Sequence, residues 1–424
     1  MSKHVTHRVP PGHIPEVGID HRPAQRVTRG RWLPVGGLLF AAGWGANHFA
    51  PLLLLYQRQF GLSNLATAAI FGAYAVGLIP SFLVGGPLAD RFGRRRVAVP
   101  AVVASMFGSL TLMLGARYPA ALSFGRVLVG LSAGAAFTAA TAWVRDLSSN
   151  EPAGTGARRA ASCLSAGFAL GPLVSGAIAQ WGPAPALLPY VIHLILTIPI
   201  LGAASLAPEI ADDGGRVRTA PIAWLRPSTD VRFWKLTAPA APWVFASATI
   251  AFVTLPALVH SGVPGAPIAY AGLVTAITLA TGIAAQPAAR WLDRRTRFGL
   301  PAGLACCVVG CLVGAVAVGH RSPWLALFDA LILGAAYGIL VATGLTDVER
   351  LARPEERARL ASSFYSLAYS GIGAPYLIAA LARHSSSVTA LLAAGGLAAA
   401  TGLYLLTTST LQETDVGQSL SSSR

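Results

Sequence analysis

Charged residues are scarce in this sequence. Asp, Glu, Lys and Arg make up 12% of its 424 residues, and the mean hydropathy is +0.58. In a soluble globular domain, about a quarter of the residues are charged. The shortage of charge therefore excludes a soluble globule and indicates a protein whose partner is the lipid bilayer.

Long stretches almost without charge alternate with short polar links along the chain. Each stretch approaches or exceeds the roughly 20 residues that an α-helix needs to cross a bilayer. The sequence thus predicts an all-α membrane protein with twelve transmembrane helices, at Leu33–Tyr56, Leu65–Leu88, Val97–Ala116, Ala120–Val144, Ala160–Trp181, Pro185–Leu206, Phe233–Val259, Ala266–Ala289, Gly299–Gly319, Pro323–Thr346, Arg359–Ala382 and Val388–Thr408.

Groups that carry catalysis or bind metals are also few. The four cysteines, Cys163, Cys306, Cys307 and Cys311, all fall inside the predicted spans, which favours packing over a disulfide or metal framework. The spans contain no nucleophile–base set, metal cluster or phosphate loop, and no sizeable soluble domain separates them. We therefore expect neither an enzyme nor a bound cofactor or metal ion.

Acidic residues are outnumbered, with 17 Asp and Glu against 32 Lys and Arg, for a formal net charge of +15. The basic residues gather in the N-terminal tail and in the links after spans 2, 4, 6, 8 and 10. The alternate links hold only Arg58, Arg117, Arg321 and Arg383. The positive-inside rule places both termini in the cytoplasm of a multi-pass protein of the inner or plasma membrane. Membrane topology thus accounts for the charge without a nucleic-acid partner.

The longest link divides the spans six and six. Several pairs recur at an offset of 203 residues, namely Asp90 and Asp293, Asp146 and Glu349, Pro172 and Pro375, and Arg126 and Asp329. Such a repeat predicts two pseudo-symmetric six-helix bundles with a cavity between them. The predicted parts are a disordered cytoplasmic tail at 1–31, bundles at 32–206 and 233–408, a cytoplasmic linker at 207–232 and a second disordered tail at 409–424.

The densest charge lies in the link after span 2, GGPLADRFGRRR at residues 85–96. Gly85 and Gly86 allow the ends of spans 2 and 3 to approach closely. Asp90 can accept backbone N–H bonds at a helix start and pair with a neighbouring arginine. The arginines hold the loop at the cytoplasmic face, where anionic lipids attract them.

The order of these residues resembles the signature loop between helices 2 and 3 of the major facilitator superfamily, which is matched by Gly86, Leu88, Asp90, Arg91, Gly93, Arg94 and Arg95. The resemblance covers all twelve spans and implies a transporter fold in which this loop is a charge-relay latch that stabilises the outward-open state. The second-half counterpart keeps Asp293 and Arg294, but Ala289 and Thr296 replace glycines. We expect Asp146 and Glu349, at cytoplasmic helix ends, to be gate partners.

Two further motifs resemble those of the same superfamily. The run Arg126-Val-Leu-Val-Gly130 in span 4 is similar to a motif associated with proton coupling. Span 5 has Ser175 in place of one glycine but otherwise resembles the antiporter motif found mainly in exporters, with Gly167, Gly171, Pro172 and Gly176. Plain helix packing is the alternative explanation of these small residues.

Ionisable residues inside the spans are costly, so a functional role is the default hypothesis. Arg126, Asp329 and His48 are the candidates for proton coupling. We expect Arg126 and Asp329 to pair across the outer part of the cavity when the transporter faces inward, or each to pair within its own half. A structural ion pair, or snorkelling to the interface, is the alternative. His48 could instead be a neutral histidine bonded to a neighbouring helix, the role we expect for His193.

Carboxylates are almost absent from the expected cavity helices, which favours neutral or mixed amphipathic compounds over lipophilic cations. Aromatic and polar groups at the right depth would form the walls of a site for such a small-molecule substrate. The candidate substrate-binding residues are Trp44, Asn47, His48, Trp243, Tyr337 and Tyr369.

These patterns predict a monomeric, proton-coupled secondary transporter that exports drug-like or metabolite compounds by alternating access. An importer of sugars or organic acids on the same fold and a non-transporting membrane sensor are the alternatives. Accumulation of a labelled solute in energised cells would favour the importer. A ligand that binds without crossing would favour the sensor.

Overall fold

The computed structural model describes residues 30–209, 230–296, 298–352 and 356–421. Most of the predicted N-terminal tail, most of the linker and the side chain of Arg294 lie outside this part of the chain. All regular secondary structure in the described residues is helical, and twelve segments are long and apolar enough to cross a membrane. The predicted all-α protein with twelve transmembrane helices is confirmed.

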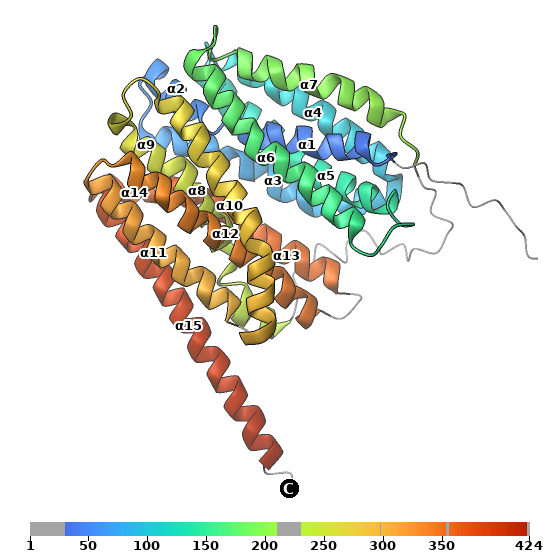
Figure 1. Ribbon diagram of the computed structural model, residues 1–424, viewed down its shortest axis with the longest axis vertical. Helices are drawn as coiled ribbons and strands as arrows, with labels where there is room; N and C mark the ends of the chain where they lie inside the picture. The colour runs from blue at the N-terminus through green and yellow to red at the C-terminus, as the bar shows by residue number, and fades with distance from the viewer. Residues whose placement is uncertain (1–29, 210–229, 297, 353–355, 422–424) are drawn as a thin grey trace, which may run out of the picture.

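Six spans form the N-terminal half, drawn from blue to green in Figure 1. Span 1 consists of two helices separated by a turn, and each later span of this half is one continuous helix. The helices are α1 (Leu33–Asn47), α2 (Leu52–Phe60), α3 (Asn64–Phe92), α4 (Arg94–Leu114), α5 (Pro119–Asp146), α6 (Thr155–Trp181) and α7 (Leu188–Ser205).

The C-terminal half, drawn from yellow to red, repeats this plan with more interruptions. Span 7 comprises η1 (Phe233–Thr237), α8 (Ala241–Thr249), η2 (Ile250–Thr254), α9 (Leu255–Val259) and η3 (His260–Gly262). The remaining helices are α10 (Pro267–Thr296), α11 (Gly299–Gly319), α12 (Pro323–Leu351), α13 (Arg357–Ser370), η4 (Gly371–Gly373), α14 (Ala374–Ala382) and α15 (Ser387–Ser421).

Three spans are interrupted close to prolines. In span 1 the α-helix ends at Asn47 and resumes after Pro51, which has no backbone N–H to continue the hydrogen-bond ladder. Span 7 contains the π-turn η2 just ahead of Pro256, and span 11 contains the 3-10 turn η4 just ahead of Pro375. Irregular backbone at membrane depth is tolerated where protein buries it. The break in span 1 and the whole of η2 are buried in this way.

Close helix crossings depend on glycine. A Cβ atom on Gly77 of α3 would overlap the carbonyl of Val127, and one on Gly130 of α5 would overlap the carbonyl of Tyr74. The two backbones are therefore in direct contact, as is typical of membrane helices that associate through small residues. Large apolar side chains that face away from the bundle, such as Phe107 and Leu397, are exposed and suited to lipid contact.

The halves meet along two pairs of spans. Helix α6 packs beside α10, as Figure 1 shows, and α3 packs against α13 and α14. Phe71 of α3 meets Phe252 of η2 edge to face, with ring centroids 6.0 Å apart.

Helix α15 continues past Thr408 to Ser421 and projects beyond the bundle, whereas the sequence predicts a disordered tail from residue 409. That stretch lacks proline, the residue that interrupts an α-helix most strongly.

Candidate functional site

The two ends of the bundle differ in charge. The links after spans 2, 4, 6, 8 and 10 lie at one end, which we call the basic end because Arg94, Arg95, Arg96 and Arg159 lie there. The alternate links lie at the opposite end. The assignment of the basic end to the cytoplasm stays a prediction from the positive-inside rule.

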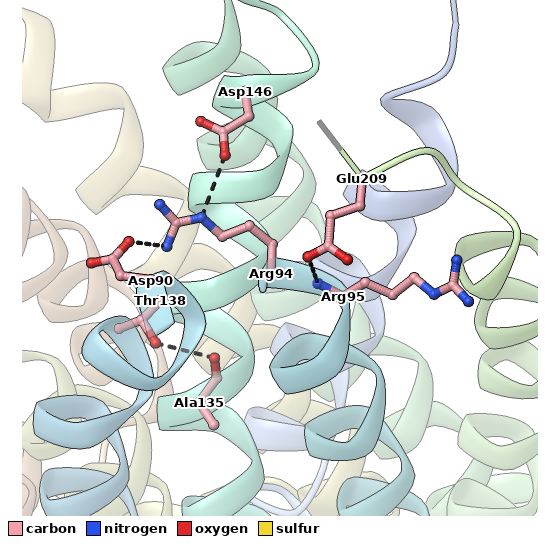
Figure 2. Close-up of polar contacts among 7 residues, drawn as sticks. All are labelled: Asp90, Arg94, Arg95, Ala135, Thr138, Asp146 and Glu209. Carbon is pink, nitrogen blue, oxygen red and sulfur yellow. Dashed lines mark hydrogen bonds and ion pairs between the residues drawn. The ribbon is translucent and has the colours of Figure 1, made fainter. Parts of the chain in front are cut away.

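An arginine of the signature loop lies between two carboxylates at the basic end (Figure 2). Arg94 forms an ion pair with Asp90, four residues earlier, and its Nε lies 3.4 Å from Asp146 Oδ2 at the end of α5. The Arg94 side chain is only 13% exposed, whereas that of Asp90 is 57% exposed. The loop between spans 2 and 3 is thereby tied to the end of span 4. Arg91, by contrast, is exposed and lies over the ring of Phe92.

A third acidic residue, which sequence reasoning missed, also holds this loop. Glu209 Oε1 accepts a hydrogen bond from the backbone N–H of Arg95, 3.1 Å away, at the start of α4. Gly93 makes room for this carboxylate and has a φ of +103°, which favours glycine. The preceding carbonyl, of Pro208, accepts a bond from Trp143 Nε1 at 3.0 Å. The start of the linker is thus attached to both α4 and α5.

The loop glycines do not act as expected. Gly85 packs against α5, where an added Cβ would lie 2.5 Å from Thr138 Oγ1 and 2.8 Å from Ala135 Cα. At Gly86 an added Cβ would meet no atom within 4 Å. The expectation that both glycines bring spans 2 and 3 together is wrong, because the close contact involves Gly85 alone and lies between spans 2 and 4. Helix rotation decides which of two adjacent glycines faces a neighbour.

The C-terminal half has a different ion pair at the corresponding position. Arg350, at the end of α12, lies 2.7 Å from Asp293 Oδ2 and 3.4 Å from Asp347 Oδ1. Asp293 is almost fully buried, with 3% of its side chain exposed. Glu349, the expected gate partner, is exposed and forms no ion pair with the described residues. At the end of α12, the residue that contacts the loop is therefore Arg350 and not the expected Glu349.

The antiporter-like motif on α6 contacts both halves of the molecule. A Cβ on Gly167 would overlap the carbonyl of Phe40, and one on Gly171 would lie 3.0 Å from Trp44 Cα, both on α1. Farther along, a Cβ on Gly176 would lie 3.0 Å from Gly272 Cα on α10. Pro172 belongs to the same contact, because a Cβ on Gly272 would lie 2.5 Å from its carbonyl oxygen. Helix α6 thus joins α1 to the opposite half.

Arg126 is fully buried in the N-terminal half without a carboxylate partner among the described residues. Its Nη1 donates to the carbonyl of Ala46 at 3.0 Å, and its Nη2 donates to that of Phe71 at 3.4 Å. The guanidinium lies 4.5–5.1 Å from the ring centroids of Phe49, Phe71 and Tyr74. The carbonyl of Ala46 at the C-terminal end of α1, the carbonyl of Phe71 on α3 and the aromatic faces therefore stabilise the charge.

Asp329 is fully buried in the C-terminal half, on α12 facing α11. A Cβ on Gly310 or Gly314 would lie 3.1 or 3.2 Å from its oxygens, so these glycines make room for the carboxyl group. Neither oxygen has a hydrogen-bond partner in the described structure. Asp329 and Arg126 form no ion pair with each other, or with another described residue, in this structure. The repeat offset sets the depth of a residue in its helix, but it does not set which neighbouring helix the side chain faces.

His48 lies at the break in span 1 and is fully buried. Its ring stacks on that of His193 from α7, with centroids 5.3 Å apart, and meets Tyr190 edge to face at 5.1 Å. The Tyr190 hydroxyl is hydrogen-bonded to that of Tyr56 at 2.9 Å. Sequence reasoning treated His193 as structural and missed the tyrosines. Tyr190 precedes His193 by three residues, about one helical turn, and that spacing was the available signal for it.

The aromatic candidates divide between two places. Tyr369 stacks on Phe245 at 4.7 Å and meets Phe82 of the other half at 5.5 Å, while Tyr337 lies 5.6 Å from Phe245. Tyr365 completes this group, 5.1 Å from Phe82 and 6.0 Å from Tyr369. We call these five residues the aromatic cluster. It bridges α3 of the N-terminal half and three elements of the C-terminal half.

The other candidates lie outside this cluster. Trp44 packs between α1 and α6, and Asn47 is half-buried at the break in span 1. Trp243 points away from the other half, toward α15, where its Nε1 donates to Thr401 Oγ1 at 3.3 Å. It lines a largely apolar cavity of about 480 Å³ between α8, α14 and α15.

A second cavity of about 480 Å³ lies between the halves at the opposite end. Its wall includes Ala50 and Gln57 from span 1, Thr67 from α3, Thr254 from η2 and Arg383 at the end of α14. Ala50 belongs to the break in span 1, two residues after His48. Such a cavity at the junction of two bundles is a typical location for a small-molecule site.

Residues 35–375 of the chain match the family described as Major Facilitator Superfamily. The chain is 38% identical to the 3-(3-hydroxy-phenyl)propionate transporter of Escherichia coli (strain K12) over 98 residues, which are 23% of this chain and 22% of that one. It is 26% identical to Multidrug resistance protein 2 of Bacillus subtilis (strain 168) over 144 residues, 34% of this chain and 36% of that one. These matches therefore span between about a fifth and about a third of the relatives.

The solved structure of a mutant of the nucleoside transporter NupG superposes with a TM-score of 0.71 at 13% identity, over 89% of this chain and 99% of that one. At this identity the superposition supports the twelve-helix, two-bundle fold and carries no information on the substrate.

Proposed function

Because this chain belongs to the major facilitator superfamily, we propose that it is a secondary active transporter that exports small molecules by alternating access, driven by protons. Its membrane is the inner or plasma membrane, with both termini in the cytoplasm. A single chain is the transport unit, since the cavity and both contact regions between the halves come from one chain.

The contact made by α6 is the observation that carries the proposal of export. One set of motif glycines packs on α1, beside the buried ionisable residues, and Gly176 packs on Gly272 of the other half. A helix in this position can transmit a movement near α1 to the contact that holds the two halves together. The similarity to Multidrug resistance protein 2 supports export, because that relative is described as a resistance protein.

The two ends of the bundle would then open in turn. At the basic end, the Arg94 and Arg350 ion pairs hold their loops, and the aromatic cluster joins the halves. At the opposite end, α6 and α10 meet beside the cavity. Breaking one set of contacts while forming the other moves a substrate across the membrane. The gating residues are therefore the loop residues Asp90 and Arg94 with Asp146, and the pair Asp293 and Arg350.

The aromatic cluster favours substrates that carry a ring. Offset and edge-to-face arrangements contribute roughly 0.5–1.5 kcal/mol for each aromatic pair beyond simple burial. Tyr337 and Tyr369 supply such rings together with hydroxyl groups, which suits neutral or mixed amphipathic compounds. Trp243 makes no part of this site, because it faces α15.

Protons would enter through the ionisable groups buried in each half. An ionised carboxylate without a partner is costly at membrane depth, so Asp329 is suited to carry a proton through the cycle. His48 offers a second position, and Arg126 keeps a fixed positive charge beside it. Their placement in opposite halves would let proton binding bias the two bundles separately.

Import of a small organic acid is the second candidate. Arg126 is a buried cation without a carboxylate partner among the described residues, and an anionic substrate would complement it. The similarity to a transporter of 3-(3-hydroxy-phenyl)propionate supports this candidate. Uptake of a labelled aromatic acid by energised cells, with no efflux of hydrophobic compounds, would favour import.

Efflux measured in inside-out vesicles tests the proposal. Fluorescent hydrophobic compounds are offered with and without an imposed pH gradient to wild type, Asp329→Asn and the control Glu151→Gln, whose carboxylate pairs with Arg159 at the basic end. We expect gradient-driven movement in wild type and control, and its loss in Asp329→Asn. Movement in wild type that ignores the gradient would reject proton coupling. Movement that survives Asp329→Asn would leave Asp329 with a structural role.

A further inference from the structure

The stacked rings of His48 and His193 form a pair of imidazoles inside the N-terminal half. Both residues are at most 1% exposed, and their centroids are 5.3 Å apart. His48 comes from the break in span 1 and His193 from α7. Two neutral rings can stack at this distance, whereas two protonated rings would repel each other in a medium of low dielectric constant.

The hydrogen bonds assign a tautomer to each ring. His193 Nε2 lies 3.1 Å from the carbonyl of Ala41, which can only accept, so Nε2 carries a hydrogen. His193 Nδ1 then accepts from the hydroxyl of Ser109 at 2.8 Å. His48 Nδ1 lies 3.0 Å from the carbonyl of Trp44 and likewise donates. This leaves His48 Nε2, which has no hydrogen-bond partner in the described structure.

Some groups around His48 favour a proton on its ring, and others disfavour one. The fixed charge of Arg126 on α5 repels a proton there, and so does any charge on His193. The carbonyls at the C-terminal end of α1 attract one. The other titratable groups that face the pair are Tyr190 of α7 with its partner Tyr56 of α2, and Tyr74 of α3 lies over Arg126. From α4 and α6 the facing groups are the serines Ser109 and Ser175.

The same point of the chain is bonded to the antiporter-like helix. Ser175 Oγ donates to the carbonyl of His48 at 2.6 Å, and both residues are buried. The next residue, Gly176, is the one that meets Gly272 of the other half. Ser175 is also the residue that replaces a glycine of the resembled motif. A single hydrogen bond therefore links the backbone of His48 to the segment of α6 that packs on α10.

We propose that His48 Nε2 binds a single exchangeable proton, that His193 positions the ring and limits the pair to one proton, and that Ser175 transmits proton binding to the contact between α6 and α10. This inference rests on the proposed proton coupling. When the proton arrives, the imidazolium repels Arg126 and shifts the backbone of the break, and the Ser175 bond moves α6 with it. His193 is a positioning residue, since both of its nitrogens are already engaged.

Nuclear magnetic resonance of ¹⁵N-histidine protein in lipid nanodiscs tests proton binding without any substrate. Signals of the pair are assigned from His48→Gln and His193→Gln and followed from about pH 8 to about pH 5, the range in which imidazoles respond. We expect the pair in wild type to gain one proton, His48→Gln to gain none at His193, and His193→Gln to gain one at His48. Two protons in wild type, none in wild type, or a proton on His193 in His48→Gln would each overturn the assignment.

Transport in proteoliposomes tests the role of Ser175. The probe is a fluorescent hydrophobic compound that wild type moves, and each variant is measured for exchange at equal pH and for accumulation against an imposed pH gradient. We expect Ser175→Ala to keep exchange and the one-proton titration while losing at least tenfold in gradient-driven accumulation. Ser366→Ala is the control, because that hydroxyl bonds within its own helix.

The outcomes separate this inference from the proposed function. Wild type that fails to exchange any compound would contradict the proposed function, while the titration would still decide the proton site. Ser175→Ala that accumulates the probe as wild type does would overturn the transmission step alone. Loss of both exchange and accumulation, with the titration intact, would also overturn it, because Ser175 would then be needed for transport itself.

Discussion

At the basic end, the two halves tie the loop to the end of the fourth span through residues at non-equivalent positions. In the N-terminal half the loop supplies the arginine, Arg94, and the end of α5 supplies a carboxylate, Asp146. In the C-terminal half the loop supplies the carboxylate, Asp293, and the end of α12 supplies the arginine, Arg350. The contact between the loop and the end of the fourth span is therefore retained, although the loop and the span end supply residues of opposite sign in the two halves.

The pairs also differ in their exposure to water. Asp90, the loop carboxylate of the first half, has 57% of its side chain exposed, whereas Asp293 has 3%. A solvent-exposed ion pair contributes little to stability, and breaking a buried one leaves an uncompensated charge. The half whose signature loop is degenerate in sequence therefore holds the ion pair that is more costly to break. Four pairs of substitutions test this asymmetry and related contrasts within the molecule.

Removing Arg350 should have the largest effect. Arg350→Ala leaves Asp293 buried and unpaired, and we expect a loss of about 3 kcal/mol in the free energy of unfolding. Arg94→Ala should cost about 1 kcal/mol, because water reaches both carboxylates that it leaves, Asp90 readily and Asp146 in part. Thermal unfolding of both variants in detergent gives the comparison. Equal losses would show that burial does not distinguish the two pairs.

Widening the contact between the halves should have the second-largest effect. Gly176→Val places methyl groups against α10, and overpacking of this kind costs roughly 1–3 kcal/mol. We expect transport to fall by tenfold or more while the protein still folds. The matched control is Gly72→Val, because a Cβ at Gly72 meets no atom within 4 Å. Similar transport by both variants would contradict the role of the α6–α10 contact.

Truncating one ring of the aromatic cluster should have a smaller effect. Tyr369→Ala removes stacking on Phe245, and we expect apparent substrate affinity to fall about tenfold, equivalent to roughly 1.4 kcal/mol. Trp243→Ala removes a ring of similar burial that faces α15, and its affinity should match that of wild type. Concentration dependence of transport measures both. A greater loss with Trp243→Ala would move the substrate site to the cavity beside α15.

Releasing the linker should have the smallest effect. Glu209→Ala removes the acceptor for the Arg95 amide, and loss of such a cap costs about 0.5–1 kcal/mol. We expect faster hydrogen exchange at the Arg95 amide with little change in global stability. Glu349→Ala, which removes an exposed carboxylate, should leave that exchange rate unchanged. An unchanged rate in Glu209→Ala would show that the cap is not maintained in solution.

Sequence periodicity and motifs predicted much of this site but not its partners. The loop residues Asp90, Arg94 and Asp146 were identified and do meet, because residues at the ends of adjacent helices have few directions in which to point. Glu209 and Arg350 were missed, and His193 was expected only to have a structural role. None of them belongs to a motif, and each acts through a contact with a residue more than 50 positions away.

The amino-acid sequence by itself determined the twelve spans and the two bundles, because bilayer thickness and the cost of unpaired backbone groups in lipid depend only on the length and polarity of each segment. Only the tertiary structure decided which buried groups meet. Arg126 and Asp329 share a depth but face different helices, and Gly85 rather than Gly86 forms the close contact. Helix rotation determines these pairings, and packing of the whole bundle sets that rotation.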